Sequence, residues 1–100
     1  MNILHLPLKK QWYDMIERGE KTEEYRDINA YWLPRLVDLS KRVNTFKPFT
    51  HVRFRLGYTK TTMLREIESI SVGYGKPEWG APTDRRVYII KLKPHGTDQQ

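Results

Sequence analysis

Apolar and polar residues alternate at the start of the chain and then change period. The alternation over residues 2–6 predicts a short strand, which Pro7 ends. From Leu8 onward the apolar positions recur at the spacing of a helix, and Gly19 is well placed to stop that helix. The apolar face of this predicted helix consists of Leu8, Trp12, Met15 and Ile16.

The next segments predict an extended stretch over residues 21–26 and then a second helix. Asn29 is suited to cap this helix, and Pro34 fits only its first turn. Its expected apolar face consists of Leu33, Leu36, Val37 and Leu39. A loop is expected over residues 44–49.

The second half of the chain reads as three strands. Residues 52–56 alternate, which predicts a half-buried strand with Arg53 and Arg55 on its open face. Residues 58–61 suit a hairpin connection, and 63–72 form the longest predicted strand. The apolar phase of that strand slips between Ile67 and Ile70, which indicates a bulge near Glu68 and Ser69. A glycine- and proline-rich loop over 73–82 precedes a last strand at 87–92.

The order strand, helix, strand, helix and three strands predicts an α+β domain. Early helices followed by consecutive strands favour a strongly curved sheet or small β-barrel flanked by two helices. We expect one domain over residues 1–93 and a polar C-terminal tail over residues 94–100.

Composition narrows the class of protein. The 100 residues contain no cysteine, which excludes disulfides and thiolate metal sites. The sequence shows neither a signal-peptide pattern nor a membrane-spanning apolar run, so we expect a cytoplasmic protein without a membrane partner. His5, His51 and His95 are scattered singly, and we expect neither a metal site nor a cofactor. The oligomeric state stays open.

Positive charge is concentrated in one quarter of the chain. Residues 41–65 contain seven lysines and arginines and no acidic residue, whereas the formal net charge of the whole chain is +6. Such clustering attracts polyanions, although a solvated charged face is an equal alternative. The seven residues are Lys41, Arg42, Lys47, Arg53, Arg55, Lys60 and Arg65.

The candidate chemistry lies just after the first predicted helix. In an extended segment, Glu24 and Arg26 point to one face, and a bend after Gly19 would bring Lys21 beside them. The alternative is an ordinary turn with exposed charges and a weak local ion pair.

These residues match a known pattern. Gly19, Lys21, Glu24 and Arg26 fit the G-x-K-x-x-E-x-R signature of the ASCH domain family. The resemblance extends over almost the whole chain, to about Lys93, and it includes the segments 3–12, 31–36, 52–58 and 73–80. It implies a PUA-like barrel whose signature lines a cleft, in a module that binds RNA, another nucleic acid or a modified base.

One branch of the ASCH family implies an enzyme instead. That branch removes the acetyl group from N4-acetylcytidine nucleosides with a lysine, a threonine nucleophile three residues later and a distant glutamate. Here Lys21 matches the lysine, but Glu24 stands at the nucleophile position. A hydrolase would therefore use Glu24 as a base on water, Lys21 or Arg26 to stabilise the oxyanion, and Glu78 or Glu66 for a proton. A ribonuclease is a further alternative.

The binding hypothesis assigns the same residues to recognition. Lys21 and Arg26 would hold a phosphate or a base carbonyl, and Glu24 would accept from an exocyclic amine. The aromatic residues expected to stack a base are Tyr31, Trp32, Tyr58 and Trp79, with core packing as the alternative. Trp12 and Phe54 are expected in the core.

The basic segment favours binding of RNA over an enzyme acting on free nucleosides. A nucleoside has no phosphate to meet the basic residues expected to face the ligand, which are Arg53, Arg55, Lys60 and Arg65. A basic face that binds an acidic protein is another alternative.

Overall fold

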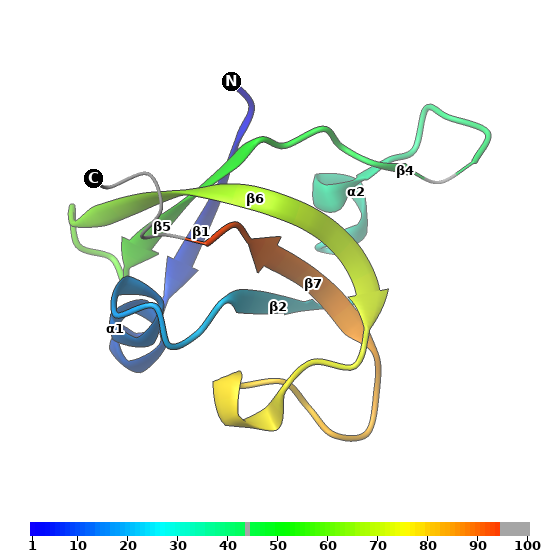
Figure 1. The fold of residues 1–100 in the computed structure, drawn as a ribbon. Helices are drawn as coiled ribbons and strands as arrows, with labels where there is room; N and C mark the ends of the chain where they lie inside the picture. Colours follow the sequence, from blue (N-terminus) through cyan, green and yellow to red (C-terminus); the bar gives the residue numbers. More distant parts are fainter. Residues whose placement is uncertain (44, 95–100) are drawn as a thin grey trace.

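The computed structural model describes residues 1–43 and 45–94. Within them, the strands are β1 (Ile3–Leu8), β2 (Glu23–Asp27), β3 (Val37–Asp38), β4 (Thr45–Phe46), β5 (His51–Leu56), β6 (Thr62–Gly73) and β7 (Val87–Leu92). The helical segments are α1 (Lys10–Glu17), α2 (Leu33–Leu36) and the short 3-10 turn η1 (Pro77–Trp79). Figure 1 shows α1 beside the ends of β1 and β5, and α2 near the opposite side of the sheet.

The main sheet has five strands in the order β1-β5-β6-β7-β2 within the described residues. β1 runs parallel to β5, and the other neighbours are antiparallel. The first part of β6 pairs with β5 and the second part with β7, so this long strand arches across the molecule (Figure 1). The register shifts between Ile67 and Ser69, which confirms the predicted bulge and helps the strand to bend there.

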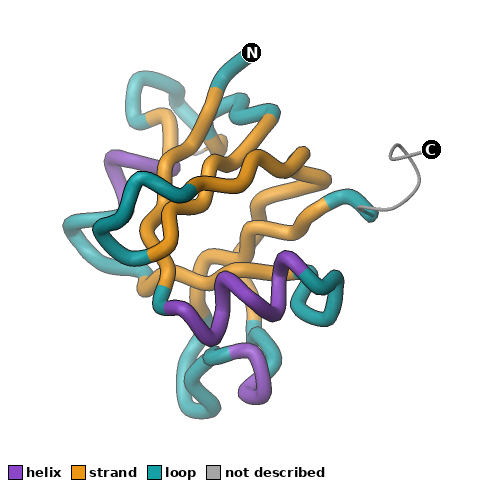
Figure 2. The backbone as a smooth tube through the Cα atoms, turned by 90° about the vertical axis from the view of Figure 1, so that its left-hand side faces the viewer, coloured by secondary structure: helices purple, strands orange, loops and turns teal. Residues whose placement is uncertain are grey.

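The sheet does not close into a barrel, which corrects that part of the prediction. In the described chain, β1 and β2 are the two edges and do not pair with each other. Pro7 lies in β1 and has no N–H to offer to a closing strand, which suits it to an edge. Instead, the Arg26 side chain of β2 donates to the Pro7 carbonyl at 2.9 Å. The fold is therefore α+β with an open sheet, and Figure 2 shows how the strands curve around the interior.

The main core lies inside the curve of the sheet. Alternate leucines of β1 face inward with Phe54 of β5, which is fully buried as expected. Helix α1 contributes Tyr13 and Ile16 to this core. Trp12, expected in the core, is only partly buried, because α1 is rotated so that its Tyr13 side faces the sheet.

The second helix is shorter than predicted. The Asn29 carboxamide accepts from the backbone N–H groups of Tyr31 and Trp32 at 3.1 and 2.9 Å, so it caps a turn that leads into α2. Val37 is extended and begins β3, opposite Phe46, so Val37 and Leu39 are not part of a helical face.

The predicted loop over residues 44–49 contains β4, although its first residue, Asn44, lies outside the described residues. The predicted tail lies outside them as well, except for Pro94.

A long loop, residues 74–86, covers the outer face of β2 and β7. Tyr25 of β2 packs beneath it with Ala81 and Val87 in a second, smaller apolar cluster. A Cβ on Gly75 would overlap the Tyr25 ring and would lie 2.7 Å from the Ala81 Cβ, so glycine is needed for this close approach. The loop is thereby held against β2, which places η1 beside the Lys21–Arg26 segment. No described helix is long and apolar enough to span a membrane.

Candidate functional site

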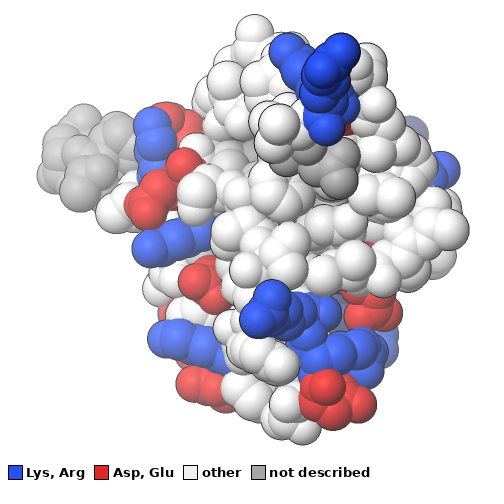
Figure 3. Space-filling view, turned by 90° about the vertical axis from the view of Figure 1, so that its right-hand side faces the viewer, with Lys and Arg blue, Asp and Glu red and all other residues white. Residues whose placement is uncertain are grey.

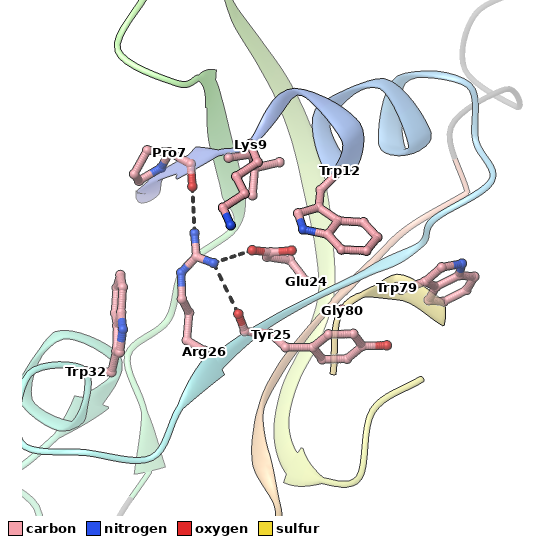
Figure 4. Close-up of a pocket in the computed structure, with 10 residues that line it drawn as sticks. Pro7, Lys9, Trp12, Glu24, Tyr25, Arg26, Trp32, Trp79 and Gly80 are labelled. Carbon is pink, nitrogen blue, oxygen red and sulfur yellow. Dashed lines mark hydrogen bonds and ion pairs between the residues drawn. The ribbon is translucent and has the colours of Figure 1, made fainter. Parts of the chain in front are cut away.

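A cleft of about 360 Å³ lies between the end of β1, the start of α1, β2 and η1. This volume is within the range of small-molecule sites, roughly 300–1,000 Å³. Its walls include all three tryptophans of the chain, which come from three separate segments (Figure 4). The complete lining consists of Pro7, Leu8, Lys9, Trp12, Glu24, Tyr25, Arg26, Trp32, Trp79 and Gly80.

The Glu24 carboxylate lies in this cleft between two cations. Glu24 is only 4% exposed. Its Oε1 lies 3.2 Å from the Lys21 ammonium, and its Oε2 forms an ion pair with the Arg26 guanidinium. A buried carboxylate needs such partners, because burial of an unpaired charge is very costly. The three signature side chains therefore converge, as the sequence predicts.

Lys21 supports the cleft from behind. A turn at Gly19, where φ is +81°, reverses the chain after α1, and the Lys21 N–H then donates to the Met15 carbonyl at 3.1 Å. The Lys21 side chain is fully buried, and its ammonium donates to the Trp79 carbonyl at 2.5 Å. The ammonium also lies 5.0 Å from the ring centre of Trp12.

The ammonium of Lys21 is thus committed to protein groups. Burial lowers its pKa, and the charge of Glu24 opposes this shift. Among the described residues, Lys21 is not part of the cleft wall. Its ammonium contacts Glu24 and the Trp79 carbonyl, so Lys21 positions these two residues rather than facing a ligand.

Arg26 spans the gap between the two edge strands. Its guanidinium donates to the carbonyls of Tyr25 and Pro7 at 3.1 and 2.9 Å, besides its ion pair with Glu24. The guanidinium also lies 5.2 Å from the ring centre of Trp32. Figure 4 shows these contacts around the opening of the cleft. Arg26 therefore fixes the Glu24 carboxylate and one aromatic wall together.

Six lining residues are not among those that the sequence predicts for the site, and two of them, Lys9 and Trp12, carry side chains suited to ligand binding. Lys9 directly precedes α1, and Figure 4 shows its ammonium directed into the cleft toward Glu24 and Arg26. Trp12, which the sequence predicts in the core, follows three residues later. The i, i+3 spacing of Lys9 and Trp12 is a usable signal, because the N-cap residue and the third residue of a helix lie on the same side of its first turn.

Other predicted site residues lie outside the cleft. Tyr31 packs edge-on against Trp32 and lies under Arg35, whose guanidinium is 3.6 Å from the Tyr31 ring centre. Glu78 is exposed on η1 and does not line the cleft. Tyr58 is 97% exposed in the hairpin between β5 and β6. Among the predicted aromatic residues, the cleft therefore gathers Trp32 and Trp79.

The predicted basic segment does not form one patch. Arg65 is buried and donates to the Ile16 carbonyl at the end of α1, so its role is structural. Lys41 and Arg42 lie on the connection between β3 and β4, which extends to the right in Figure 1 while β5 lies at the left. On the face in Figure 3, basic side chains stand in separate groups; acidic side chains lie among the groups at the left and bottom, and mostly uncharged residues separate these from the group at the top.

The basic strand β5 lies beside β1, whose last residues line the cleft. Its residues Arg53 and Arg55 alternate with buried Val52 and Phe54, so they occupy the outer face as predicted. Arg55 is the register partner of Pro7, which lines the cleft. The adjoining hairpin, which carries Tyr58 and Lys60, is tied to the cleft wall by the Gly57 N–H, which donates to the Leu8 carbonyl at 2.8 Å.

Replacement of Tyr25 by Phe tests how the 74–86 loop is held. The Tyr25 hydroxyl donates to Glu23 at 2.7 Å and accepts from the Lys76 N–H at 3.0 Å. We expect Tyr25→Phe to lower the free energy of unfolding by about 1 kcal/mol at pH 8. Urea unfolding provides the measurement. Tyr58→Phe, at a 97% exposed position, is the control and should have no effect.

The stability difference between the wild type and Tyr25→Phe should also depend on pH. Burial raises the pKa of Tyr25, and its hydrogen bond to Glu23 adds to the shift. Above about pH 10 an unfolded tyrosine loses its proton while folded Tyr25 retains it, so the stability contributed by Tyr25 falls as the pH rises. The stability difference between the wild type and Tyr25→Phe should therefore shrink between pH 10 and 11. A constant difference would contradict the burial of this hydroxyl.

The described residues contain no group of three or more His, Cys, Asp and Glu side chains placed to hold a metal ion. Comparisons with protein-family models, with curated proteins and with solved structures find no match to this chain.

Proposed function

We propose that the chain is a small ASCH-type, PUA-like module that binds single-stranded nucleic acid, with RNA as the favoured ligand, and that the cleft holds one base. The observation that carries this proposal is the combination of three tryptophan walls with a buried, doubly paired carboxylate. Aromatic faces stack bases of any sequence, at about 1–3 kcal/mol per base.

Polar groups in the cleft suit the edge of a base. A carboxylate only accepts hydrogen bonds, so Glu24 is matched to an exocyclic amino group. Each of its oxygens keeps a free lone pair beyond its bond to a cation. The Lys9 ammonium, which points toward Glu24, supplies donors for a carbonyl or a phosphate (Figure 4).

The basic outer face of β5 favours a polynucleotide over a free nucleoside. Arg55 is the register partner of Pro7, a residue of the cleft wall, and Arg53 continues the row along the strand. A phosphate chain leaving the cleft in this direction would meet these arginines and Lys60. Phosphate contacts position a nucleic acid without reading its sequence.

The geometry offers less support for the alternative, an amidohydrolase acting on N4-acylated cytidine. Lys21 is buried with its ammonium bound to Trp79 and Glu24, and Glu78 stands outside the cleft. Only Glu24 and Arg26 of the proposed catalytic set line it. The test is to incubate the protein with excess N4-acetylcytidine and to measure cytidine by mass spectrometry. Release over many turnovers would mean that the protein is a hydrolase and not a binding module.

Salt dependence of RNA binding tests the proposal. With Lys9, Arg53, Arg55 and Lys60 as phosphate contacts, the log-log slope of the binding constant against salt should be near −3, about −0.7 per contact. Arg55→Gln should flatten this slope by about 0.7. Arg42→Gln, a matched charge removal outside β5, should leave it unchanged. Fluorescence anisotropy of a labelled RNA 8-mer gives the slopes, and a response independent of salt would contradict the proposal.

A further inference from the structure

A second hollow of about 390 Å³ adjoins the cleft. Four residues line both spaces: Tyr25, Arg26, Trp32 and Gly80. Beyond this shared wall, the second hollow is lined by Asp27, Ala81, Pro82, Arg85 and Val87. Part of a ligand whose base occupies the cleft can therefore reach the second hollow past Arg26 and Trp32.

One polar pair distinguishes this second hollow. The Asp27 Oδ1 at the end of β2 lies 3.2 Å from an Arg85 Nη2 in the loop before β7. Their side chains are 51% and 55% exposed, so each can make further contacts. Arg85 is held from its other side by Asp84, at 3.1 Å, and Asp84 does not line the hollow. An acceptor and a donor thus lie side by side, next to the proposed base site.

This pairing suits a hydroxyl group better than a phosphate. A hydroxyl both donates and accepts, so it can donate to the Asp27 carboxylate and accept from the Arg85 guanidinium at the same time. A phosphate would meet the negative charges of Asp27 and Asp84, which offset the attraction of Arg85. The sugar is the part of a nucleotide that adjoins the base, and the 2′-hydroxyl distinguishes RNA from DNA.

We propose that Asp27 and Arg85 bind the ribose 2′-hydroxyl of the nucleotide whose base lies in the cleft, so that the protein selects RNA over DNA. This inference rests on the proposed function. It adds a specificity-determining pair, Asp27 and Arg85, that lies outside the Gly19–Arg26 signature.

Binding of two matched oligonucleotides tests this inference. The probes are a single-stranded RNA 8-mer and the DNA 8-mer of the same base sequence, with uracil retained in both. The wild type should bind RNA about three- to tenfold more tightly than DNA, the range expected for one net hydrogen bond. Asp27→Ala should bring that ratio to about one by weakening RNA binding alone. Asp84→Ala, which removes the same charge and also a partner of Arg85, is the control and should keep the ratio.

The outcomes separate this inference from the proposed function. If neither 8-mer binds, both are overturned. If both bind but the RNA preference is absent in the wild type, or persists in Asp27→Ala, the proposed function stands and the assignment of Asp27 and Arg85 is wrong. A rise in affinity for both probes in Asp27→Ala, with the ratio unchanged, would show only a general charge effect and would also overturn the assignment.

Discussion

Lys21→Met should lower the free energy of unfolding by about 3 kcal/mol, the cost of breaking a buried ion pair by removing one partner. The substitution keeps a side chain of similar length but removes the charge beside Glu24 and the donor to the Trp79 carbonyl. Glu24 would retain only Arg26. Urea denaturation followed by circular dichroism measures the change.

Lys10→Met is the matched control for this substitution. The Lys10 side chain is 76% exposed and pairs with Asp14 at 2.6 Å on the surface of α1. Exposed pairs contribute about 0–1 kcal/mol, so this variant should unfold close to the wild type. Equal stability of Lys21→Met and Lys10→Met would mean that Lys21 does not support the cleft, and Lys21 would again be a candidate for direct ligand contact.

Trp12→Leu should weaken RNA binding about 10- to 100-fold, because base stacking on an aromatic side chain is lost while an apolar side chain remains. Trp32→Leu should have a similar effect, and it also removes the ring beside the Arg26 guanidinium. Anisotropy titrations with the labelled RNA 8-mer measure both. The expected loss is among the largest for any single substitution that leaves the buried ion pairs intact.

Tyr31→Leu provides the comparison within the same segment. Tyr31 is 56% exposed and touches Trp32 edge-on, but it does not line the cleft. Its replacement should change RNA affinity less than threefold, because stacking in the cleft is retained. A large loss with Tyr31→Leu and none with Trp12→Leu would move the base site out of the cleft and onto the outer surface near α2.

Local sequence patterns predicted the signature segment well. Strand alternation predicts Glu24 and Arg26 on one face, and both line the cleft, whereas the intervening Tyr25 lines the cleft and also packs beneath the 74–86 loop. The phase slip in β6 was equally visible, since a bulge changes which residues face the core. The strand faces and the bulge each depend on a few neighbouring residues, so the spacing of apolar residues in the sequence is enough to predict them.

Other features depend on how the elements meet. The apolar spacing of the first helix includes Trp12, but the rotation of α1 against the sheet leaves Trp12 at the cleft and buries Tyr13. The basic segment is continuous in sequence, but strand pairing and the end of α1 bury Arg65 and separate Lys41 and Arg42 from β5. No local pattern encodes these contacts, because the partners are far apart along the chain.

By itself, the sequence determined an α+β chain with a Lys-Glu-Arg segment after its first helix, because turns, periods and charge spacing are local properties. Only the tertiary structure decided that the sheet stays open, that Lys21 is buried behind the cleft, and that three distant tryptophans surround Glu24. The physical reason is that closure and burial depend on long-range packing. Pro7 leaves β1 as an edge, and Arg26 occupies the resulting gap with its guanidinium.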